Sequence, residues 1–298
     1  MRHIISVRDM DRRAIDELLD RAAEIEARRY DPNLLRGKIL GLFFFEPSTR
    51  TRMSFESAMA RLGGVSLNMG SVEASSVAKG ETLADTIRVV SGYVDAIVLR
   101  HPKEGAARLA SEFASVPVIN AGDGAGQHPS QTLLDLYTIR KSMPLDGLRI
   151  GLLGDLRYGR TTHSLAIALS LYGAEIAAVA PKGLELPSGI VQELADRGTS
   201  VTEYSAVEDV IADLDVLYVT RIQRERFPDM ASYLDVASSY RITPELVGLA
   251  RPHMIVLHPL PRIDEIDPRV DALPNAKYFE QAHHGVSVRM AMLGEVMG

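Results

Sequence analysis

Short apolar runs and amphipathic segments alternate along most of the chain. Residues 11–29 place apolar side chains at helical spacing, which predicts a helix with one buried face. That face would consist of Ile15, Leu18, Leu19, Ala22 and Ile25. The next apolar run, Ile39–Phe45, is short, which is typical of a buried strand. A chain that repeats this alternation is expected to form βα units around a mostly parallel sheet.

The same pattern predicts two domains. Before residue 142, it predicts strands at 39–45, 65–69, 96–99 and 118–120, and helices at 51–62, 81–93, 104–113 and 130–141. After the turn-rich segment Met143–Gly147, it restarts with strands at 149–153, 175–179, 215–219 and 254–257, and a helix at 161–172. A chain of 298 residues can bury two separate cores. We therefore expect the α/β class, with two doubly wound domains, each a mostly parallel sheet flanked by helices, and a boundary near residues 138–147.

Composition excludes several classes of protein. Hydrophobic residues make up 46% of the chain and charged residues 24%, as in ordinary globular domains. The net charge of −6 argues against a surface for nucleic acid or membrane. The absence of cysteine excludes disulfides, thiolate metal sites and a cysteine nucleophile. No metal-ligand spacing is visible either, because the adjacent His283 and His284 would diverge on a helix or a strand.

The N-terminal residues 1–11 are charged and lack the apolar core of a signal peptide. No stretch approaches the roughly 20 apolar residues of a membrane span. The cytoplasm is therefore the expected location.

The segment Phe45–Glu56 joins a predicted strand to a predicted helix. Within it, Ser48–Arg52 reads Ser-Thr-Arg-Thr-Arg and brings hydroxyls, guanidinium groups and free backbone N–H groups to a helix N-terminus. The alternative is an N-capped helix with two solvated arginines, because Ser and Thr are common caps. Five such residues in a row exceed what a cap needs, so we interpret the segment as a phosphate site. The phosphate would be part of a substrate.

Three other motifs of the first domain suit a ligand. Arg100 ends a predicted strand, where ligands of open α/β sheets bind, although a surface arginine fits the position equally well. The small polar loop 75–81 carries Lys79, which could close over an anion, although most loop lysines are solvated. His128 follows a glycine-rich stretch that would allow close backbone approach to a ligand, although a loop histidine can also cap or pack.

Three motifs of the second domain follow predicted strands. Gly151–Asp155 invites a dinucleotide interpretation, but the GxGxxG pattern is not met, which disfavours nicotinamide binding. In the charged run after Val219, Arg221 and Gln223 share a direction if the chain is extended, although such a run is usually a solvated face. The prolines of His258–Arg262 constrain a loop so that its carbonyl groups can point at a substrate amine.

Together these motifs resemble the transcarbamoylases, the aspartate and ornithine carbamoyltransferase family. Ser48–Arg52 matches the family's carbamoyl-phosphate motif without a gap, and six separated motifs agree in order along nearly the whole chain. The resemblance implies an active site in the cleft between the two domains. Residues 1–140, completed by a C-terminal helix at 285–298, would bind carbamoyl phosphate, and residues 141–284 would bind the second substrate.

The family pattern also implies the roles of individual residues. Carbamoyl phosphate would be bound by Ser48, Thr49, Arg50, Thr51, Ser75, Lys79, Arg100, His128, Gln131, Leu260 and Pro261. Aspartate would be bound by Lys79, Arg160, Arg221, Gln223 and Leu260. The catalytic residues would be Arg50, Thr51, Lys79, Arg100 and His128. Arg289 matches a further arginine of the family, and we expect it to form a structural or active-site salt bridge.

The loop His258–Arg262 separates the branches of the family. Ornithine carbamoyltransferases have His-Cys-Leu-Pro here, whereas this chain reads His-Pro-Leu-Pro-Arg and has no cysteine. The resemblance therefore implies transfer of the carbamoyl group of carbamoyl phosphate to the amino group of L-aspartate, without a cofactor, for pyrimidine biosynthesis. The alternatives are a carbamoyltransferase for another amino acid and a catalytically silent assembly or regulatory homologue.

The family also implies a homotrimer in which Ser75 and Lys79 reach the active site of the neighbouring subunit. Some trimers of the family assemble with a separate zinc-containing regulatory chain, so a partner of this kind is an open alternative. The chain departs from the family at Ala78, where many aspartate enzymes carry a second lysine. One charge of the loop is therefore missing.

Overall fold

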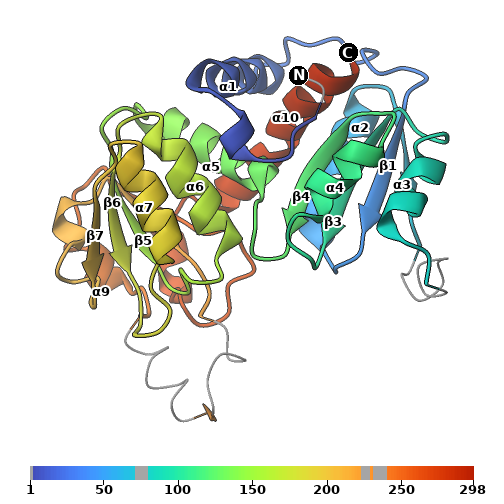
Figure 1. Ribbon diagram of the computed structural model, residues 1–298. Coiled ribbons are helices and arrows are strands. Elements are labelled where there is room, and N and C mark those ends of the chain that lie inside the picture. Colours follow the sequence, from blue (N-terminus) through green and yellow to red (C-terminus); the bar gives the residue numbers. More distant parts are fainter. Residues whose placement is uncertain (1–2, 71–79, 223–228, 231–239) are drawn as a thin grey trace. The chain divides into compact units, whose positions relative to one another are not determined.

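The chain divides into two compact units, each with its own sheet (Figure 1). The computed structural model describes residues 3–70, 80–222, 229–230 and 240–298. Unit 1 consists of Met1–Tyr137 together with His283–Gly298, and unit 2 consists of Thr138–Ala282. The chain passes from one unit to the other inside two helices, α5 (Pro129–Ser142) and α10 (Tyr278–Met297).

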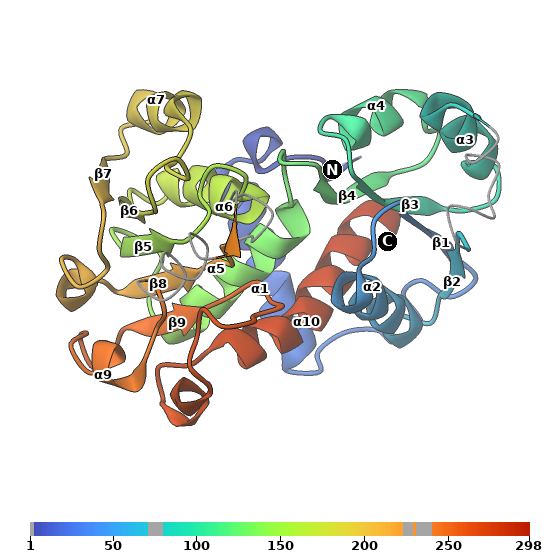
Figure 2. The same ribbon diagram turned by 90° about the horizontal axis from the view of Figure 1, so that it is seen from below.

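Unit 1 is built on a parallel sheet with the order β2-β1-β3-β4. Its strands are β1 (Ile39–Phe44), β2 (Val65–Asn68), β3 (Ala96–His101) and β4 (Val118–Asp123). Figure 2 shows α3 (Leu83–Val90) and α4 (Ala106–Phe113) on one face of this sheet and α2 (Thr49–Arg61) on the other. The five residues predicted to form the apolar face of the first helix are all buried on α1 (Arg12–Glu26).

Coverage on both faces explains why the central strands β1 and β3 are mostly apolar. Successive side chains of a strand point to opposite faces. On one face, Phe43 and Leu99 pack in a cluster with Ile87 of α3. Their neighbours Leu42 and Val98 point to the other face and are equally buried.

Unit 2 is built on a five-stranded parallel sheet with the order β7-β6-β5-β8-β9. Its strands are β5 (Arg149–Leu153), β6 (Glu175–Val179), β7 (Val201–Tyr204), β8 (Val216–Val219) and β9 (Ile255–Leu257). Its helices are α6 (Arg160–Ser170), α7 (Ser188–Asp196), the single-turn α9 (Pro244–Val247), and the 3₁₀ turns η4 (Ile211–Asp213) and η6 (Pro268–Ala272).

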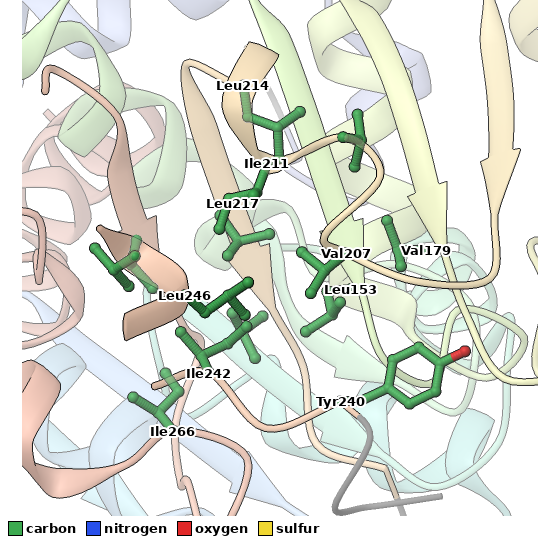
Figure 3. Close-up of a cluster of buried hydrophobic side chains, with 14 of the residues drawn as sticks. Leu153, Val179, Val207, Ile211, Leu214, Leu217, Tyr240, Ile242, Leu246 and Ile266 are labelled. Atoms are coloured by element: carbon green, nitrogen blue, oxygen red, sulfur yellow. The ribbon is translucent and has the colours of Figure 1, made fainter. Parts of the chain in front are cut away.

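Short segments cover one face of this second sheet. Figure 3 shows Leu153, Val179 and Leu217, which project from the strands, in one buried cluster with Ile211 of η4 and Leu246 of α9. Strands β5, β6 and β8 are thus buried on this face mainly by short segments, to which Tyr278 at the start of α10 adds.

The predicted fold class is confirmed: each unit is a parallel sheet flanked by helices. Some predicted boundaries were wrong: the last helix begins at Tyr278 rather than at residue 285, and the helix predicted at 81–93 is Leu83–Val90. The sequence also failed to predict α7 and β7. Among the described residues, no helix is long and apolar enough to cross a bilayer.

Candidate active site

Unit 1 has a topological switch point between β1 and β3, since the chain leaves β1 toward β2 on one side and later returns as β3 on the other. Ligands of open α/β sheets bind beyond the carboxyl ends of strands at such a point. The loop after β1 leads into α2, and the backbone N–H of Phe45 donates to the carbonyl oxygen of Arg100 at 2.8 Å. The start of α2 and the end of β3 are therefore joined at the position expected for a ligand.

The N-terminus of α2 is suited to an anion. Ser48 is the N-cap residue, with an extended backbone (φ −158°, ψ 102°), and its side chain makes no capping hydrogen bond. The first turn of a helix has free N–H groups that point toward an incoming anion. Thr51 is buried, whereas Thr49 and Arg50 are exposed. Desolvation lowers the pKa of the Arg50 guanidinium.

Arg100 adds a second guanidinium at these strand ends. Its side chain is 16% exposed, and its Nε lies 3.4 Å from Oε2 of Glu46, in the loop before α2. Its Nη1 donates to the carbonyl oxygen of Ala121 in β4 at 3.4 Å. These contacts hold the positive charge of Arg100 between β4 and the segment that starts α2, where an anion at the helix N-terminus would meet it.

A buried carboxylate organises the turn before His128. Asp123 accepts hydrogen bonds from the side-chain amide of Asn120 at 2.9 Å and from the backbone N–H of Gln127 at 3.0 Å. It also accepts from the backbone N–H of Gly105 at 2.9 Å, which ties the turn to the start of α4. Gly124 has φ +50°, and a Cβ there would lie 2.6 Å from the backbone nitrogen of Glu104. The turn therefore requires both the carboxylate and this glycine.

His128 and Gln131 follow this turn at the start of α5, and both are buried. The Nδ1 of His128 lies 3.4 Å from the hydroxyl of Ser130. The side-chain amide of Gln131 donates to Oδ1 of Asp135, one turn further along the helix, at 2.8 Å. The Gln131 amide is thus oriented from within its own helix.

Arg289, on α10, is buried and its guanidinium lies 5.1 Å from the centre of the Phe55 ring of α2. Burial lowers its pKa to about 10, while attraction to Asp135 acts in the opposite direction. Its Nε has no hydrogen-bond partner among the residues that the structure describes. Arg289 therefore lies between α2 and α5, the two helices whose first turns carry the predicted phosphate and carbonyl ligands.

Unit 2 has its own switch point, between β5 and β8. The turn after β5 contains Gly154 with φ +119°, and a Cβ there would collide with the carbonyl oxygen of Thr220 at the end of β8. This close approach brings the segment before Arg160, the first residue of α6, next to the segment before Arg221. Both arginines are partly buried. Arg160 and Arg221 therefore both follow strands at the carboxyl edge of the second sheet, which places two cationic residues at this edge.

The loop His258–Arg262 follows β9 in the same unit. Leu260 has φ +55°, which is unusual for a branched residue. At the end of the loop, Arg262 hydrogen-bonds Asp271 and the hydroxyl of Tyr278. The hydrogen bond from Arg262 is the main reason that the pKa of Asp271 lies below its ordinary value.

Three of the predicted site residues, Ser75, Lys79 and Gln223, lie outside the described residues. Within the part of the chain that is described, no group of three His, Asp or Glu side chains could hold a metal ion. Sequence reasoning missed Asp123, and it missed Glu265, which accepts hydrogen bonds from the backbone N–H groups of Ile263 and Asp264 after β9. Their only local signal is a carboxylate inside a turn-rich segment, which is too common to be specific.

An α/β chain with a phosphate-type helix N-terminus at one switch point and arginines at another has the features of a protein that binds anionic ligands. The family model described as "Aspartate/ornithine carbamoyltransferase, carbamoyl-P binding domain" matches residues 2–141. The model described as "Aspartate/ornithine carbamoyltransferase, Asp/Orn binding domain" matches residues 146–295. The chain belongs to the aspartate/ornithine carbamoyltransferase family.

Individual relatives point to one branch of this family. The chain is 74% identical to the aspartate carbamoyltransferase catalytic subunit of Methanosphaerula palustris and 69% identical to that of Methanoculleus marisnigri, in each case over 100% of both chains. The catalytic subunit of the M. jannaschii aspartate transcarbamoylase has a similar structure (TM-score 0.92, 54% identity, 99% of this chain and 98% of that one).

The aspartate transcarbamoylase of Trypanosoma cruzi, solved with N-(phosphonacetyl)-L-aspartic acid, is also similar (TM-score 0.93, 42% identity, 100% of this chain and 96% of that one).

Proposed function

We propose that this chain is an enzyme that transfers the carbamoyl group of carbamoyl phosphate to the amino group of L-aspartate. The products are N-carbamoyl-L-aspartate and phosphate, in pyrimidine biosynthesis. The observation that carries this proposal is the α2 N-terminus, with Ser48 free of a capping bond, joined to Arg100 at the switch point of unit 1. The full-length relatives named aspartate carbamoyltransferase support the second substrate.

In this proposal, unit 1 binds carbamoyl phosphate. Ser48, Thr49 and Thr51 donate to the phosphate from the first turn of α2, and Arg50 and Arg100 neutralise its charge. His128 hydrogen-bonds the carbonyl oxygen, and Gln131 contacts the carbamoyl group. The same donors stabilise the oxyanion that develops on this oxygen, which is the main catalytic contribution of the site.

Unit 2 binds aspartate. Arg221 pairs with the side-chain carboxylate, Arg160 holds a carboxylate of the substrate, and Gln223 orients the amino group. The backbone of Leu260 and Pro261 completes both substrate sites. The amine attacks the carbamoyl carbon, the bond from this carbon to the phosphate oxygen breaks, and the leaving phosphate accepts the proton of the amine. No covalent intermediate and no cofactor are required.

We further propose a homotrimer in the cytoplasm, in which Ser75 and Lys79 complete the site of the neighbouring subunit.

Exposed apolar side chains of unit 1 support the proposal of a subunit interface. Val65 (58% exposed) and Leu67 (48%) lie on the edge strand β2, and Val89 (50%) and Tyr93 (65%) lie on or just after α3. Large apolar side chains that are exposed in one unit are available for a protein interface. The segment 71–79 joins these two elements in sequence.

Mixing two inactive variants tests the shared site. Trimers that contain both Arg50→Ala and Lys79→Ala chains should regain part of the wild-type activity, because some sites then carry neither lesion. Absence of recovery in trimers shown to be mixed contradicts the shared site.

A second experiment tests for a regulatory chain. The mass of the complex, measured after purification from its native source, decides whether a separate zinc-containing regulatory chain is bound.

A steady-state assay with carbamoyl phosphate and aspartate, ornithine or no second substrate tests the reaction. We expect release of phosphate with aspartate only. Turnover of ornithine or of another amino acid favours a different carbamoyltransferase. Inactivity with every amino acid favours a silent homologue.

A further inference from the structure

A buried imidazole–carboxylate pair, His258 and Glu265, supports the loop His258–Arg262 of unit 2. His258 follows β9 and is 2% exposed. Its Nδ1 accepts a hydrogen bond from the backbone N–H of Leu260 at 2.8 Å. The ring proton is therefore on Nε2, which donates to Oε1 of Glu265 at 2.8 Å. The pair thus has a defined tautomer and a defined direction.

Glu265 extends the same network to the far side of the loop. Its Oε2 accepts hydrogen bonds from the backbone N–H groups of Ile263 and Asp264, each at 3.0 Å. Burial raises the pKa of Glu265, but the hydrogen bonds from His258 and Ile263 outweigh this effect, so the pKa lies below its ordinary value. The carboxylate is therefore ionised at neutral pH, and one side-chain pair binds three backbone N–H groups within residues 260–264.

The loop needs this support because of Leu260. A left-handed conformation is strained for a residue with a Cβ and persists only where the surroundings fix it. Here the hydrogen bond to His258 lies directly on the backbone nitrogen of Leu260. His258 is in turn held by Gln281, whose Oε1 accepts from the His258 backbone N–H at 2.9 Å. The chain of contacts therefore runs from α10 through His258 to Leu260.

We propose that His258 and Glu265 are positioning residues for carbamoyl transfer. They hold the backbone of Leu260 and Pro261 in the conformation that meets the substrates, and they touch neither substrate themselves. This inference rests on the proposed function, because it takes Leu260 and Pro261 as the substrate-contacting residues of the loop.

The two nitrogens of His258 can be tested separately. In His258→Asn, the side-chain oxygen can still accept from the N–H two residues later, as in an Asx turn, but the donor to Glu265 is lost. In His258→Gln, a donor can still reach Glu265, but the acceptor for Leu260 is lost. Both variants lose one buried hydrogen bond, so both should lower the thermal midpoint.

The two variants should differ in kinetics. We expect kcat/KM for aspartate to fall about 100-fold in His258→Gln, because misplacing a positioning group by ~1 Å has effects of this size. His258→Asn should lose much less activity, because it keeps the acceptor for the Leu260 N–H and loses only the bond to Glu265, and Glu265→Gln should fall between the two variants. Equal kinetics in the two His258 variants would overturn the inference.

Asp215 offers a matched control in the same unit. It also joins an imidazole, that of His253 at 2.8 Å, to a backbone N–H, that of Arg149 at 2.9 Å. These contacts lie at the amino ends of the strands, away from the loop. Asp215→Asn should lower the thermal midpoint and leave the kinetics unchanged. If its kcat/KM falls as that of His258→Gln does, the effect is a general loss of stability and the inference is wrong.

The wild-type protein separates the two hypotheses. If it turns over aspartate and the His258 variants are equal, only the positioning role fails. If it does not turn over aspartate, the proposed function fails and the positioning role fails with it.

Discussion

The two arginines assigned to phosphate have different surroundings. Arg100 is mostly buried and held by Glu46 and the Ala121 carbonyl, whereas Arg50 is exposed on the first turn of α2. The position of Arg50 at a helix N-terminus could be predicted from the sequence, because Ser48–Arg52 is contiguous and a strand and a helix flank it. Asp123 and Glu265 could not, because their roles depend on backbone N–H groups that only the folded loops bring within reach.

Arg50→Ala and Arg221→Ala should fail differently. Arg50 is assigned to the phosphate, so its loss should weaken equilibrium binding of carbamoyl phosphate and also lower kcat. Arg221 is assigned to aspartate, and removing one partner of a desolvated charge pair costs about 2–5 kcal/mol. Calorimetry should find carbamoyl phosphate binding intact in Arg221→Ala. Loss of that binding in a folded Arg221→Ala variant contradicts the assignment.

Gly154 and Gly147 both have positive φ but differ in the space around them. At Gly154 (φ +119°) a Cβ would meet the backbone of Thr220, whereas at Gly147 (φ +67°) nothing lies within 4 Å. Gly147→Ala should therefore cost only backbone strain, about 1–2 kcal/mol. Gly154→Ala adds a collision and should cost about 3 kcal/mol or more. Urea denaturation of both variants measures the difference, and equal losses would mean that the close approach to Thr220 is not rigid.

At the scale of elements, the predictions that failed have physical reasons. The sequence did not predict β7, because it is an edge strand with no buried residue and so lacks a strong apolar pattern. The start of α10 was misplaced because Gly285 resembles a helix boundary. In the structure Gly285 is inside the helix, and the guanidinium of Arg289 occupies the space that a Cβ would need.

Asp215 joins the amino ends of β5, β8 and β9, which should make its contribution to stability depend on pH. Burial raises its pKa, but hydrogen bonds from the Arg149 N–H and His253 outweigh this effect, so its pKa is lowered in the folded protein. A lowered folded-state pKa means that the stabilisation is present above the unfolded-state pKa, about 3.9, and is lost as pH falls below it. Asp215→Asn should therefore destabilise the protein at pH 7 by about 1.5–3 kcal/mol.

Denaturation midpoints over a pH series check this expectation. The difference between wild type and Asp215→Asn should shrink on acidification. Asp213→Asn is the control, because the Asp213 side chain is 55% exposed and pairs with Arg149 at the surface. Its cost should stay within about 0–1 kcal/mol. A constant difference between wild type and Asp215→Asn across the pH series would rule out the carboxylate as the cause.

At the scale of the whole molecule, the alternation of strands and helices predicted the α/β class and the two parallel sheets. It could not predict which apolar residues are exposed and so support the proposed subunit interface. Exposed apolar residues such as Val65 and Tyr93 cannot be distinguished from core residues before their exposure is known.

A bisubstrate analogue tests the assignment of one substrate to each unit. A phosphonate joined to an aspartate-like dicarboxylate would engage the residues assigned in unit 1 and unit 2 with one molecule. Because a tethered ligand loses translational and rotational freedom only once, it should bind far more tightly than either substrate. The ornithine analogue should bind weakly, because an ammonium would replace the carboxylate that Arg221 pairs with. Calorimetry compares the affinities of the two analogues. Tighter binding of the ornithine analogue would change the assignment of the second substrate and leave the assignment of carbamoyl phosphate unchanged.

Unit 1 is made from two separate stretches of chain, and this has a consequence for protein synthesis. Unit 2 occupies residues 138–282, so a ribosome has produced all of it before it begins residues 283–298, which unit 1 still lacks. Arg289 packs on Phe55, 234 positions earlier, so α2, the helix assigned to phosphate, waits for a contact with residues that are made after all of unit 2. The unit that starts first in the sequence is therefore the one that can finish folding last, and during that interval α2 depends on its contacts with β1 and β2.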